Sequence, residues 1–449
     1  MNGHNLCKIE GAGVSLDDLL GGDADDDDRR RLRAGARQAV NDKDGRYFGF
    51  QPYSAESPEG EFGYYVGIGR LPEASECTLH ISARQFRSVE RAVFQIDYVR
   101  MYADCAADPD VSRHLSRCLT VYPDEMPIEV DDDDVWSPLI ALAYLNALHI
   151  LVQRHLRRDF IAREETLYGR ARGQIRVGRY ITQYRSRGHP EAVPCRFGAL
   201  EHDTPENRIL RTALVGAKRL LDRQTGRNLA NWHTWARQAD VALAGAAIAR
   251  IEPRDFQAAR KTGAYRHYAT PLALGKAVLT RVGFDPNQRF EPDAIGRKVR
   301  MVPFRLKTEE LFERYVEARL RAMEPVADDD GVWVGYDDKN LEDKICGSGF
   351  LVRPDFLVRW GDLRLILDAK YKDFSKQKPG GSEDENSFRW DTYQVLAYSQ
   401  HRGVKQQLSG RPGDGAAPSA MILCYPVNRS GVLSPLSQTQ VEHLVLRTA

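Results

Sequence analysis

The sequence lacks the cysteine patterns that mark zinc knuckles and disulfide frameworks. Its seven cysteines are scattered, odd in number and include no CxxC pair. Structural zinc sites and disulfide-stapled domains need cysteines at characteristic spacings. Scattered thiols favour a reducing compartment, so we expect a cytoplasmic protein.

Long hydrophobic runs are also missing. The longest apolar stretch covers residues 138–152 and contains Asn146 and His149. It is shorter than the roughly 20 residues that cross a bilayer, so we predict a buried helix and no membrane partner. The N-terminus has no basic segment followed by an apolar core, and no signal peptide is expected.

The chain has no excess of one charge, with 64 basic and 63 acidic residues. Any nucleic-acid surface must therefore be local. A P-loop is absent, because Gly275-Lys276 is followed by Ala277 and Thr270 stands where the first glycine would be. We therefore expect no GTP or ATP hydrolysis by this chain alone. The Gly-x-Ser-x-Gly elbow and the HExxH motif are also missing, which counts against serine hydrolases and zinc proteases.

Length and patterning predict a multidomain α+β chain, since 449 residues allow two to three domains. The first 44 residues carry an acidic run at 23–28 and are predicted to form a flexible arm. A β-rich domain is predicted over 45–130. It rests on β-like runs punctuated by glycine and proline, at 64–71, 78–83 and 92–98.

The pattern becomes helical after a second acidic run at 131–134. Apolar residues then recur at helical spacing, so 131–302 is predicted to be a mainly helical domain. From Pro303 the order is helix, strands, helix and strand, at 307–323, 350–371, 392–401 and 420–425. This order is typical of an α/β layer, and it predicts a fourth segment over 303–449.

Seven arginines crowd residues 163–187, against two acids, Glu164 and Glu165. One interpretation is a surface that contacts the phosphate backbone, since guanidinium groups pair with phosphates and release counterions. The other is a solvated face on a half-buried hairpin. On the first interpretation, the residues that contact DNA are Arg172, Arg176, Arg179 and Arg185.

A hairpin is predicted around Gly361-Asp362, a two-residue turn that suits type II′ with glycine first. This turn makes Trp360 face Leu363. Counting outward in the same register places Asp355 directly opposite Asp368, with Cβ atoms about 5 Å apart. Side chains alternate along a strand, so Lys370 lies on the same side as Asp368.

Two carboxylates in direct opposition repel each other, so something positive must compensate. A divalent cation held by Asp355 and Asp368 is one answer, and hard oxygen ligands suit Mg²⁺ or Mn²⁺. Lys370 would then orient a water or balance charge on a phosphate. The alternative is two solvent-facing aspartates with a lysine that only pairs with them.

These residues resemble a known nuclease signature. Pro354-Asp355, followed after twelve residues by Asp368-Ala369-Lys370, resembles the motif of the PD-(D/E)xK nucleases. Gln394 and Tyr398 resemble the QxxxY motif of the RecB-like branch. The strings around both motifs are similar to McrC, the nuclease subunit of McrBC restriction systems. Three segments of the middle region resemble the part of McrC that precedes the nuclease domain, at 167–175, 195–197 and 203–210.

The resemblance implies roles for single residues. Asp355, Asp368 and the backbone carbonyl of Ala369 would hold the metal, and Lys370 would position the attacking water. Gln394 and Tyr398 would support the site or touch DNA. A glutamate on the preceding helix would complete the site: Glu313 is the candidate, with Glu309 and Glu310 open as alternatives. The implied domain is a PD-(D/E)xK fold, a mixed sheet flanked by helices.

Structural explanations stay open for several of these residues. Gln394 stands where a capping-box glutamine would stand if Asp391 capped its helix. Tyr398 could be an ordinary core tyrosine, and a solvated helix glutamate would explain Glu313. Residues 203–207 read as a surface turn entering a helix, with Asp203 or Thr204 as the cap and a proline at the first helical position, and need no chemical role.

The resemblance implies a metal-dependent DNA endonuclease subunit of a McrBC-like defence system. Its expected partners are double-stranded DNA and an AAA+ GTPase of the McrB kind, which residues before about 130 are expected to contact. Two other functions stay open: a non-catalytic adaptor that stimulates an AAA+ motor, and a stand-alone RecB-like repair nuclease.

Overall fold

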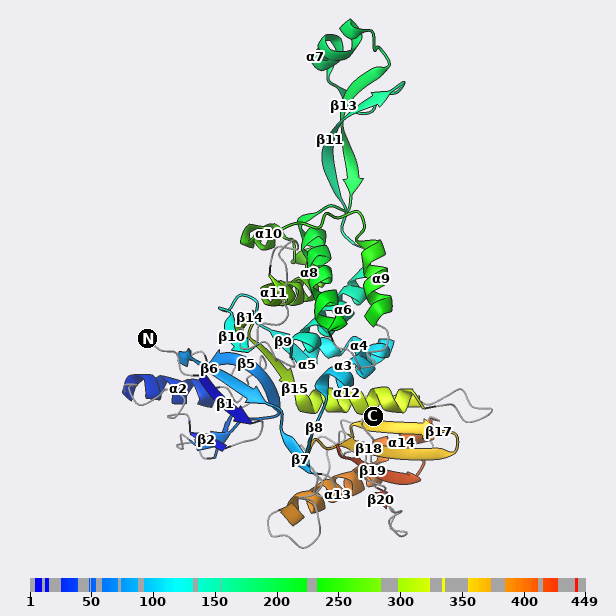
Figure 1. Cartoon of the computed structure of the whole chain (residues 1–449). Helices are drawn as coiled ribbons and strands as arrows, with labels where there is room; N and C mark the ends of the chain where they lie inside the picture. The colour runs from blue at the N-terminus through cyan, green and yellow to red at the C-terminus, as the bar shows by residue number, and fades with distance from the viewer. Residues whose placement is uncertain are drawn as a thin grey trace. The chain divides into compact units, whose positions relative to one another are not determined.

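The computed structural model describes most of the chain (Figure 1). The described residues are 5–9, 13–15, 26–38, 48, 50–53, 59–71, 74–87, 93–131, 136–154, 156–223, 232–283, 298–323, 333–335, 354–372, 384–410, 415–426 and 441–442. They form two compact units. The first draws on 1–128 and 303–449, and the second on 129–227 and 231–302.

A five-stranded sheet in the first unit joins two segments that the sequence predicted as separate domains. Its order is β1 (Asn5–Ile9), β6 (Ala74–Ser82), β5 (Tyr65–Leu71), β15 (Phe304–Lys307) and β9 (Leu119–Val121). β15 pairs antiparallel with both β5 and β9. The prediction of independent domains over 45–130 and 303–449 was therefore wrong, because β15 supplies the strand between the two N-terminal ones.

The buried side chain of Arg305 on β15 reinforces this junction. It is 1% exposed, and its guanidinium carbon lies 4.2 Å from the ring centre of Phe48 and 4.6 Å from that of Tyr122. Its Nη2 donates to the carbonyl of Arg70 at 3.2 Å. A cation enclosed by aromatic faces in a dry interior is held more strongly than one at the surface.

The predicted flexible arm over 1–44 contains regular structure, which corrects that prediction. Besides β1, it carries β2 (Gly13–Ser15) and the helix α2 (Asp26–Gln38). The end of the acidic run falls in the first turn of α2, where carboxylates favour the positive end of the helix dipole. Asp27 also pairs with Arg31 at 2.6 Å, four residues on, and Leu32 is fully buried.

Short elements complete the N-terminal part of this unit. The strands are β3 (Gln51–Pro52), β4 (Glu59–Glu61), β7 (Gln85–Arg87) and β8 (Val93–Gln95). The β-like run predicted to reach Tyr98 ends earlier, because Asp97 caps α3 (Tyr98–Ala107) by accepting from the amide of Arg100. The helices α4 (Pro109–Ser112) and α5 (Leu115–Cys118) follow, and α12 (Thr308–Arg321) packs against α3, α4 and α5.

The C-terminal sheet is mixed, as predicted. Its order is β16 (Trp333–Gly335), β17 (Phe356–Trp360), β18 (Leu363–Ala369), β19 (Ala420–Cys424) and β20 (Val441–Glu442). β16, β17 and β18 run antiparallel, whereas β18, β19 and β20 run parallel. The helices α13 (Asp384–Gln400) and α14 (Arg402–Ser409) share a core with β17, β18 and β19, and α12 contacts β16 and β18.

The second unit is built on helices. They are α6 (Trp136–Gln153), α8 (Pro205–Asp222), α9 (Trp232–Ala242), α10 (Pro253–Ala258) and α11 (Ala269–Val282), with the short turn η4 (Gly263–Tyr268). β10 (Ile128–Asp131) and β14 (Lys298–Met301) form a two-stranded sheet. By length and composition α6 could cross a membrane, but 67% of it is buried, and it packs against α8, α9 and α11. This is the buried helix that the sequence predicted.

A long hairpin extends from these helices (Figure 1). β11 (Asp159–Tyr168) pairs antiparallel with β13 (Ala192–Glu201) over ten residues, and β12 (Gln174–Ile175) adds a third strand. The segment between the strands forms α7 (Val177–Arg179), η2 (Tyr180–Tyr184) and η3 (Arg185–Arg187). The arginine-rich segment therefore occupies β11 and the tip of this hairpin.

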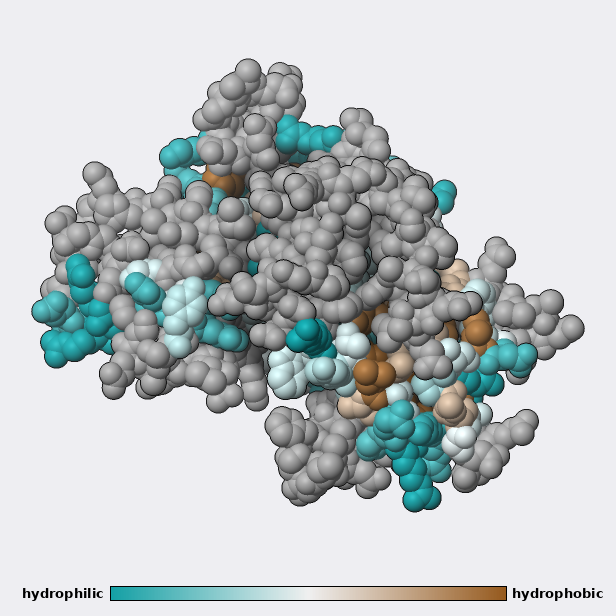
Figure 2. All heavy atoms as spheres, turned by 90° about the horizontal axis from the view of Figure 1, so that it is seen from below, coloured by the Kyte–Doolittle hydropathy of each residue, from teal (hydrophilic) through white to brown (hydrophobic). Residues whose placement is uncertain are grey.

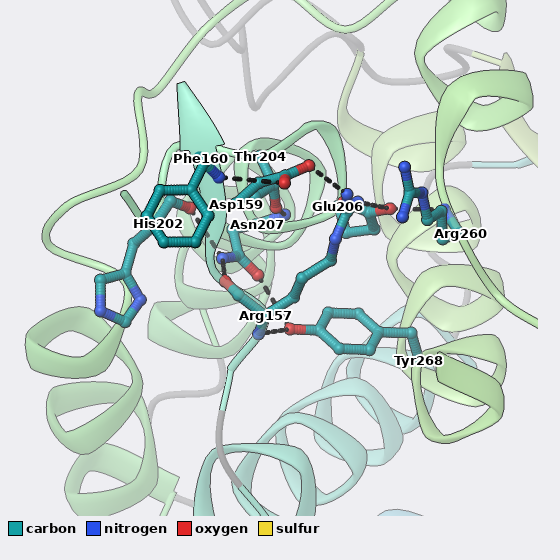
Figure 3. Close-up of polar contacts among 9 residues, drawn as sticks. All are labelled: Arg157, Asp159, Phe160, His202, Thr204, Glu206, Asn207, Arg260 and Tyr268. Carbon is teal, nitrogen blue, oxygen red and sulfur yellow. Dashed lines mark hydrogen bonds and ion pairs between the residues drawn. The ribbon is translucent and has the colours of Figure 1, made fainter. Parts of the chain in front are cut away.

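A buried polar network holds the base of the hairpin to the helices (Figure 3). Nη1 of Arg157 donates to both oxygens of Glu206, at 2.7 and 2.8 Å, and Nη2 donates to Asp159 at 2.5 Å. The side chain of Arg157 is 4% exposed and that of Glu206 is fully buried. The hydroxyl of Tyr268 accepts from the amide of Arg157 at 2.6 Å and donates to Asn207 at 3.1 Å.

The segment 203–207 therefore has a structural role. Thr204 caps α8 by accepting from the amide of Asn207, and Pro205 occupies the first turn, as the sequence predicted. The expectation of a surface turn was wrong for three of these side chains, because Thr204, Glu206 and Asn207 are 2% exposed or less. Their polar groups are buried because they bind Arg157 and the loop at the hairpin base.

We expect Glu206→Ala to lower the free energy of unfolding by about 3 kcal/mol, since it removes the buried carboxylate of Arg157 and leaves the guanidinium only the half-exposed Asp159. Denaturant unfolding of the full chain measures the loss. Asp203→Ala is the matched control, because the side chain of its partner Arg208 is 44% exposed and such a pair contributes about 1 kcal/mol or less. Equal losses in the two variants would contradict the role of the network.

Candidate active site

The hairpin of β17 and β18 has the register that the sequence predicted. Trp360 pairs with Leu363, and the ladder runs on to Phe356 opposite Leu367. Gly361 has a φ of +55°, which the first position of a two-residue primed turn requires. One step beyond the last ladder pair, Asp355 comes opposite Asp368. The turn thus brings together two carboxylates that are far from the turn itself.

Backbone and side-chain contacts hold this carboxylate pair in place. Oδ2 of Asp355 accepts from the amide of Ala369 at 2.7 Å. Asp368 is 1% exposed and forms an ion pair with Nζ of Lys370. β18 runs between β17 and β19, and the amide of Lys370 continues the pairing by donating to the carbonyl of Cys424. The alternative of solvent-facing aspartates is therefore wrong for Asp368.

The helix α13 closes one side of the site through Gln394. Nζ of Lys370 donates to Oε1 of Gln394 at 3.0 Å, and Nε2 of Gln394 donates to the hydroxyl of Tyr398 at 2.6 Å. Tyr398 is buried in the core that α13 shares with the sheet. Gln394 and Tyr398 lie one turn apart on the same face, so the buried tyrosine supports the glutamine that holds the lysine.

Asp391 does not cap α13, which corrects one explanation that the sequence left open. The helix begins seven residues earlier, at Asp384. Asp391 is therefore inside the helix and is buried, and its carboxylate accepts from Lys372 at 2.9 and 3.1 Å and from the hydroxyl of Tyr425 at 3.2 Å. The capping-box explanation for Gln394 is excluded with it.

Sequence reasoning missed the pair of Lys372 and Asp391, although a signal was present. Lys372 is two residues after Lys370, and side chains two apart in an extended segment lie on the same side. The two lysines are therefore expected to point to the same side where the chain leaves β18. Asp391 and Gln394 are three apart and lie on one side of a helix. Two lysines that leave the strand together therefore each bind one polar residue of α13.

The acids of α12 lie close enough to the carboxylate pair to affect it. The charge of Glu313 is one cause that raises the pKa of Asp355, and Lys370, Lys372 and Asp368 act on the pKa of Glu309. Burial raises the pKa of both glutamates. Glu310 instead lies 3.8 Å from Lys307. Glu309 and Glu313 are thus the acids of α12 whose electrostatics are coupled to the site. The partner of Glu313 is Arg314, whose Nη2 donates to its carboxylate at 2.7 Å.

Burial is the main cause that raises the pKa of Asp355 to about 8, and the charge of Asp368 adds to it. Burial likewise raises the pKa of Asp368, against the opposing effect of Lys370. For Lys370, burial lowers the pKa, but the ion pair with Asp368 outweighs it and the pKa is raised. In the absence of a cation the two aspartates therefore retain a proton near neutral pH, and Lys370 stays an ammonium.

The donor set fits a hard divalent cation. Asp355, Asp368 and the carbonyl of Ala369 are oxygen donors of the kind that Mg²⁺ and Mn²⁺ prefer, and burial makes the charges of both carboxylates costly without such a cation. Among the described residues, no three His, Cys, Asp or Glu side chains form a metal-binding group. Two side-chain carboxylates leave the remaining positions to water and to phosphate oxygens, which is how proteins usually bind Mg²⁺.

The four arginines predicted to contact DNA lie in the second unit, on the β11–β13 hairpin. Nε of Arg176 donates to Glu164 at 2.9 Å, and Nε of Arg179 donates to Gln183 at 2.9 Å. The guanidinium of Arg172 lies 4.6 Å from the ring centre of Phe197. Arg185 lies in η3, at the exposed tip. Arg172, Arg176 and Arg179 therefore each contact a neighbouring side chain, and all four arginines remain at the surface of the hairpin.

The fold and the site define a protein with a carboxylate pair, one member fully buried and the other partly buried, and a lysine at the end of the central strand of a mixed sheet. The family described as McrBC 5-methylcytosine restriction system component matches residues 61–408. The chain belongs to that family, which confirms the resemblance seen in the sequence.

Two solved structures from Thermococcus gammatolerans are similar at low identity. One is a refined half-complex from a tetradecameric assembly of McrB AAA+ hexamers with bound McrC. It shares 15% identity and a TM-score of 0.37 over 99% of this chain and 94% of that chain. The other is a cryo-EM structure of the McrBC complex, with 16% identity and a TM-score of 0.31 over 70% of this chain and 87% of that chain. No curated protein matches the chain.

We expect Asp368→Asn to weaken the pH dependence of the stability of the metal-free chain, because it removes the charge that adds to burial in raising the pKa of Asp355. The unfolded Asp355 loses its proton near pH 4 and the folded one near pH 8. Between these two pH values the folded chain binds a proton that the unfolded chain has lost. The stability that Asp355 contributes is therefore fully present below about pH 4 and is lost as the pH rises to about 8. Thermal melting in EDTA from pH 5.5 to 8.5 should show a flatter pH dependence in Asp368→Asn than in the natural chain.

The same variant should abolish the rise in melting temperature that Mg²⁺ or Mn²⁺ produces by binding the folded chain. Asp362→Asn, in the exposed turn of the same hairpin, is the control and should behave like the natural chain in both measurements. A cation effect that persists in Asp355→Asn and Asp368→Asn would place the metal elsewhere.

Proposed function

We propose that the chain is a McrC-like, Mg²⁺-dependent DNA endonuclease subunit with a PD-(D/E)xK active site. The observation that carries the proposal is the convergence of Asp355, Asp368 and Lys370 at the end of one hairpin. Family membership supports a role in restriction. The scattered thiols support a cytoplasmic location.

The residues divide the work of phosphodiester hydrolysis among them. Asp355, Asp368 and the carbonyl of Ala369 would hold Mg²⁺ or Mn²⁺. The bound cation supplies activation of water and neutralises charge on the phosphate. Its binding displaces the proton that the carboxylate pair retains, so metal affinity should rise with pH up to about 8.

Lys370 acts as a cation in this scheme. Its raised pKa makes it a poor general base at neutral pH, so its ammonium orients the attacking water or donates to a phosphate oxygen. Gln394 accepts from that ammonium and thereby limits where Nζ can point. Tyr398 holds Gln394 and is a positioning residue, since it bonds to the amide and not to the lysine.

The proposed partners are an AAA+ GTPase of the McrB kind and double-stranded DNA. A nuclease site without a P-loop supports dependence on a separate motor. Contact with the motor through residues before 130 stays a prediction. It should be tested with surface variants, because deleting 1–130 would remove β5 and β9 from both sides of β15 and damage the unit that carries the site.

We expect Asp368→Ala and Lys370→Ala each to lower cleavage by 100-fold or more (about 3 kcal/mol), the order of effect of removing a group that stabilises a transition state. The assay uses the full chain with an AAA+ GTPase of the McrB kind, GTP and Mg²⁺. Asp362→Ala, in the exposed turn, should cleave like the natural chain. Stimulation of the GTPase without any cleavage would support the adaptor, whereas robust cleavage without motor or nucleotide would support the stand-alone nuclease.

The arginine-rich hairpin is the proposed DNA contact. If Arg172, Arg176, Arg179 and Arg185 neutralise phosphates, DNA affinity falls with salt, and each charge removed flattens the slope of log K against log salt by about 0.9. Equilibrium binding of duplex DNA at several salt concentrations measures this slope for Arg179→Gln, Arg185→Gln and the double variant. Exposed apolar side chains share the tip, among them Val177 at 59% and Ile181 at 51%. An unchanged slope would therefore assign the tip to a protein partner.

A further inference from the structure

The outward side of α13 carries two aromatic side chains that the proposed mechanism does not use. Trp390 is 71% exposed and Tyr393 is 58% exposed. Their ring centres lie 6.3 Å apart with planes at 89°, an edge-to-face contact that leaves aromatic surface open to solvent. Arg389 is exposed beside them. We call Arg389, Trp390 and Tyr393 the α13 platform.

The platform adjoins the candidate active site through helix geometry. Trp390 is four residues before Gln394, so the two side chains are neighbours on the surface of α13. Gln394 accepts from Lys370, which pairs with Asp368. Asp391, the residue after Trp390, is anchored to Lys372 and Tyr425, and this fixes the rotation of the helix at that turn. Trp390 therefore stands at the rim of the site.

Burial shows that the helix has no structural need for these aromatics. The residues of α13 that join the core of the sheet are Val395 and Tyr398, and Asp391 and Ser399 are also buried. Trp390 and Tyr393 lie on the opposite side and contribute little to that core. Figure 2 shows the face of the molecule that is seen from below. On this face hydrophobic residues lie among hydrophilic ones, and most of the hydrophobic ones lie in the part of the first unit where Figure 1 draws β18, β19 and α13.

We propose that the α13 platform stacks on an unpaired nucleobase next to the scissile phosphate. This inference rests on the proposed function, because it takes the site beside Gln394 to hold a phosphodiester. Indole and phenol rings stack on bases of any sequence, and an adjacent guanidinium adds attraction for the backbone. A base inside an intact duplex has both faces covered by its stacked neighbours, so the platform favours a gap, an end or a locally opened strand.

Binding without cleavage tests the proposal separately from the nuclease assignment. The full chain is titrated in EDTA with two labelled DNAs of one sequence, an intact duplex and a duplex with a short single-stranded gap. We expect tighter binding to the gapped DNA, and quenching of tryptophan fluorescence that is lost in Trp390→Phe. Trp390→Ala and Tyr393→Ala should each weaken binding to the gapped DNA by about fivefold to a hundredfold, the range for loss of one stacked base.

The controls separate stacking from other effects. Trp390→Phe keeps an aromatic face and should retain most of the affinity, and Tyr53→Ala removes another exposed aromatic, 63% exposed, and should change nothing. Equal affinity of the natural chain for the two DNAs would overturn the proposal. So would a change in sedimentation of Trp390→Ala without any change in DNA binding, since that result assigns the platform to a protein interface.

Discussion

The approach of two carboxylates, the partly buried Asp355 and the buried Asp368, is the constraint on which the candidate site depends. Their hairpin forces them together, and burial raises the pKa of both. Such a pair cannot carry two charges without compensation. The amide of Ala369 and the ammonium of Lys370 supply part of it. The negative charge that these two groups leave uncompensated is the reason that the pair retains a proton, and it is the basis of the cation site that we propose.

The helix α13 completes the arrangement from a distant part of the chain. Lys370 binds Gln394 and Lys372 binds Asp391, so two successive turns of the helix are tied to the end of one strand. Asp391 is 4% exposed, so the helix residue of the Lys372–Asp391 pair is more buried than Gln394 in the Lys370–Gln394 pair. The Lys372–Asp391 pair fixes the helix, which then presents Gln394 to the ammonium of Lys370 and Trp390 at the rim of the site.

The scaffold of the first unit also depends on a non-local strand. β15 follows the whole second unit in sequence, yet it lies between β5 and β9. The chain continues directly from β15 into α12, which carries Glu309 and Glu313. The N-terminal sheet therefore supports the helix whose acids influence the pKa of Asp355 and are influenced by Lys370. Arg305, buried against Phe48 and Tyr122, lies at the centre of this junction.

The sequence by itself determined what local rules control. A two-residue turn at Gly361 sets the register that opposes Asp355 to Asp368, and Thr204 with Pro205 starts α8, because these patterns act over a few residues. Only the tertiary structure decided that 45–130 and 303–449 share a sheet, and that Asp391 binds Lys372 inside a longer helix. These outcomes depend on contacts between segments that are far apart in the chain, and the spacing of residues along the sequence does not determine which distant segments come into contact.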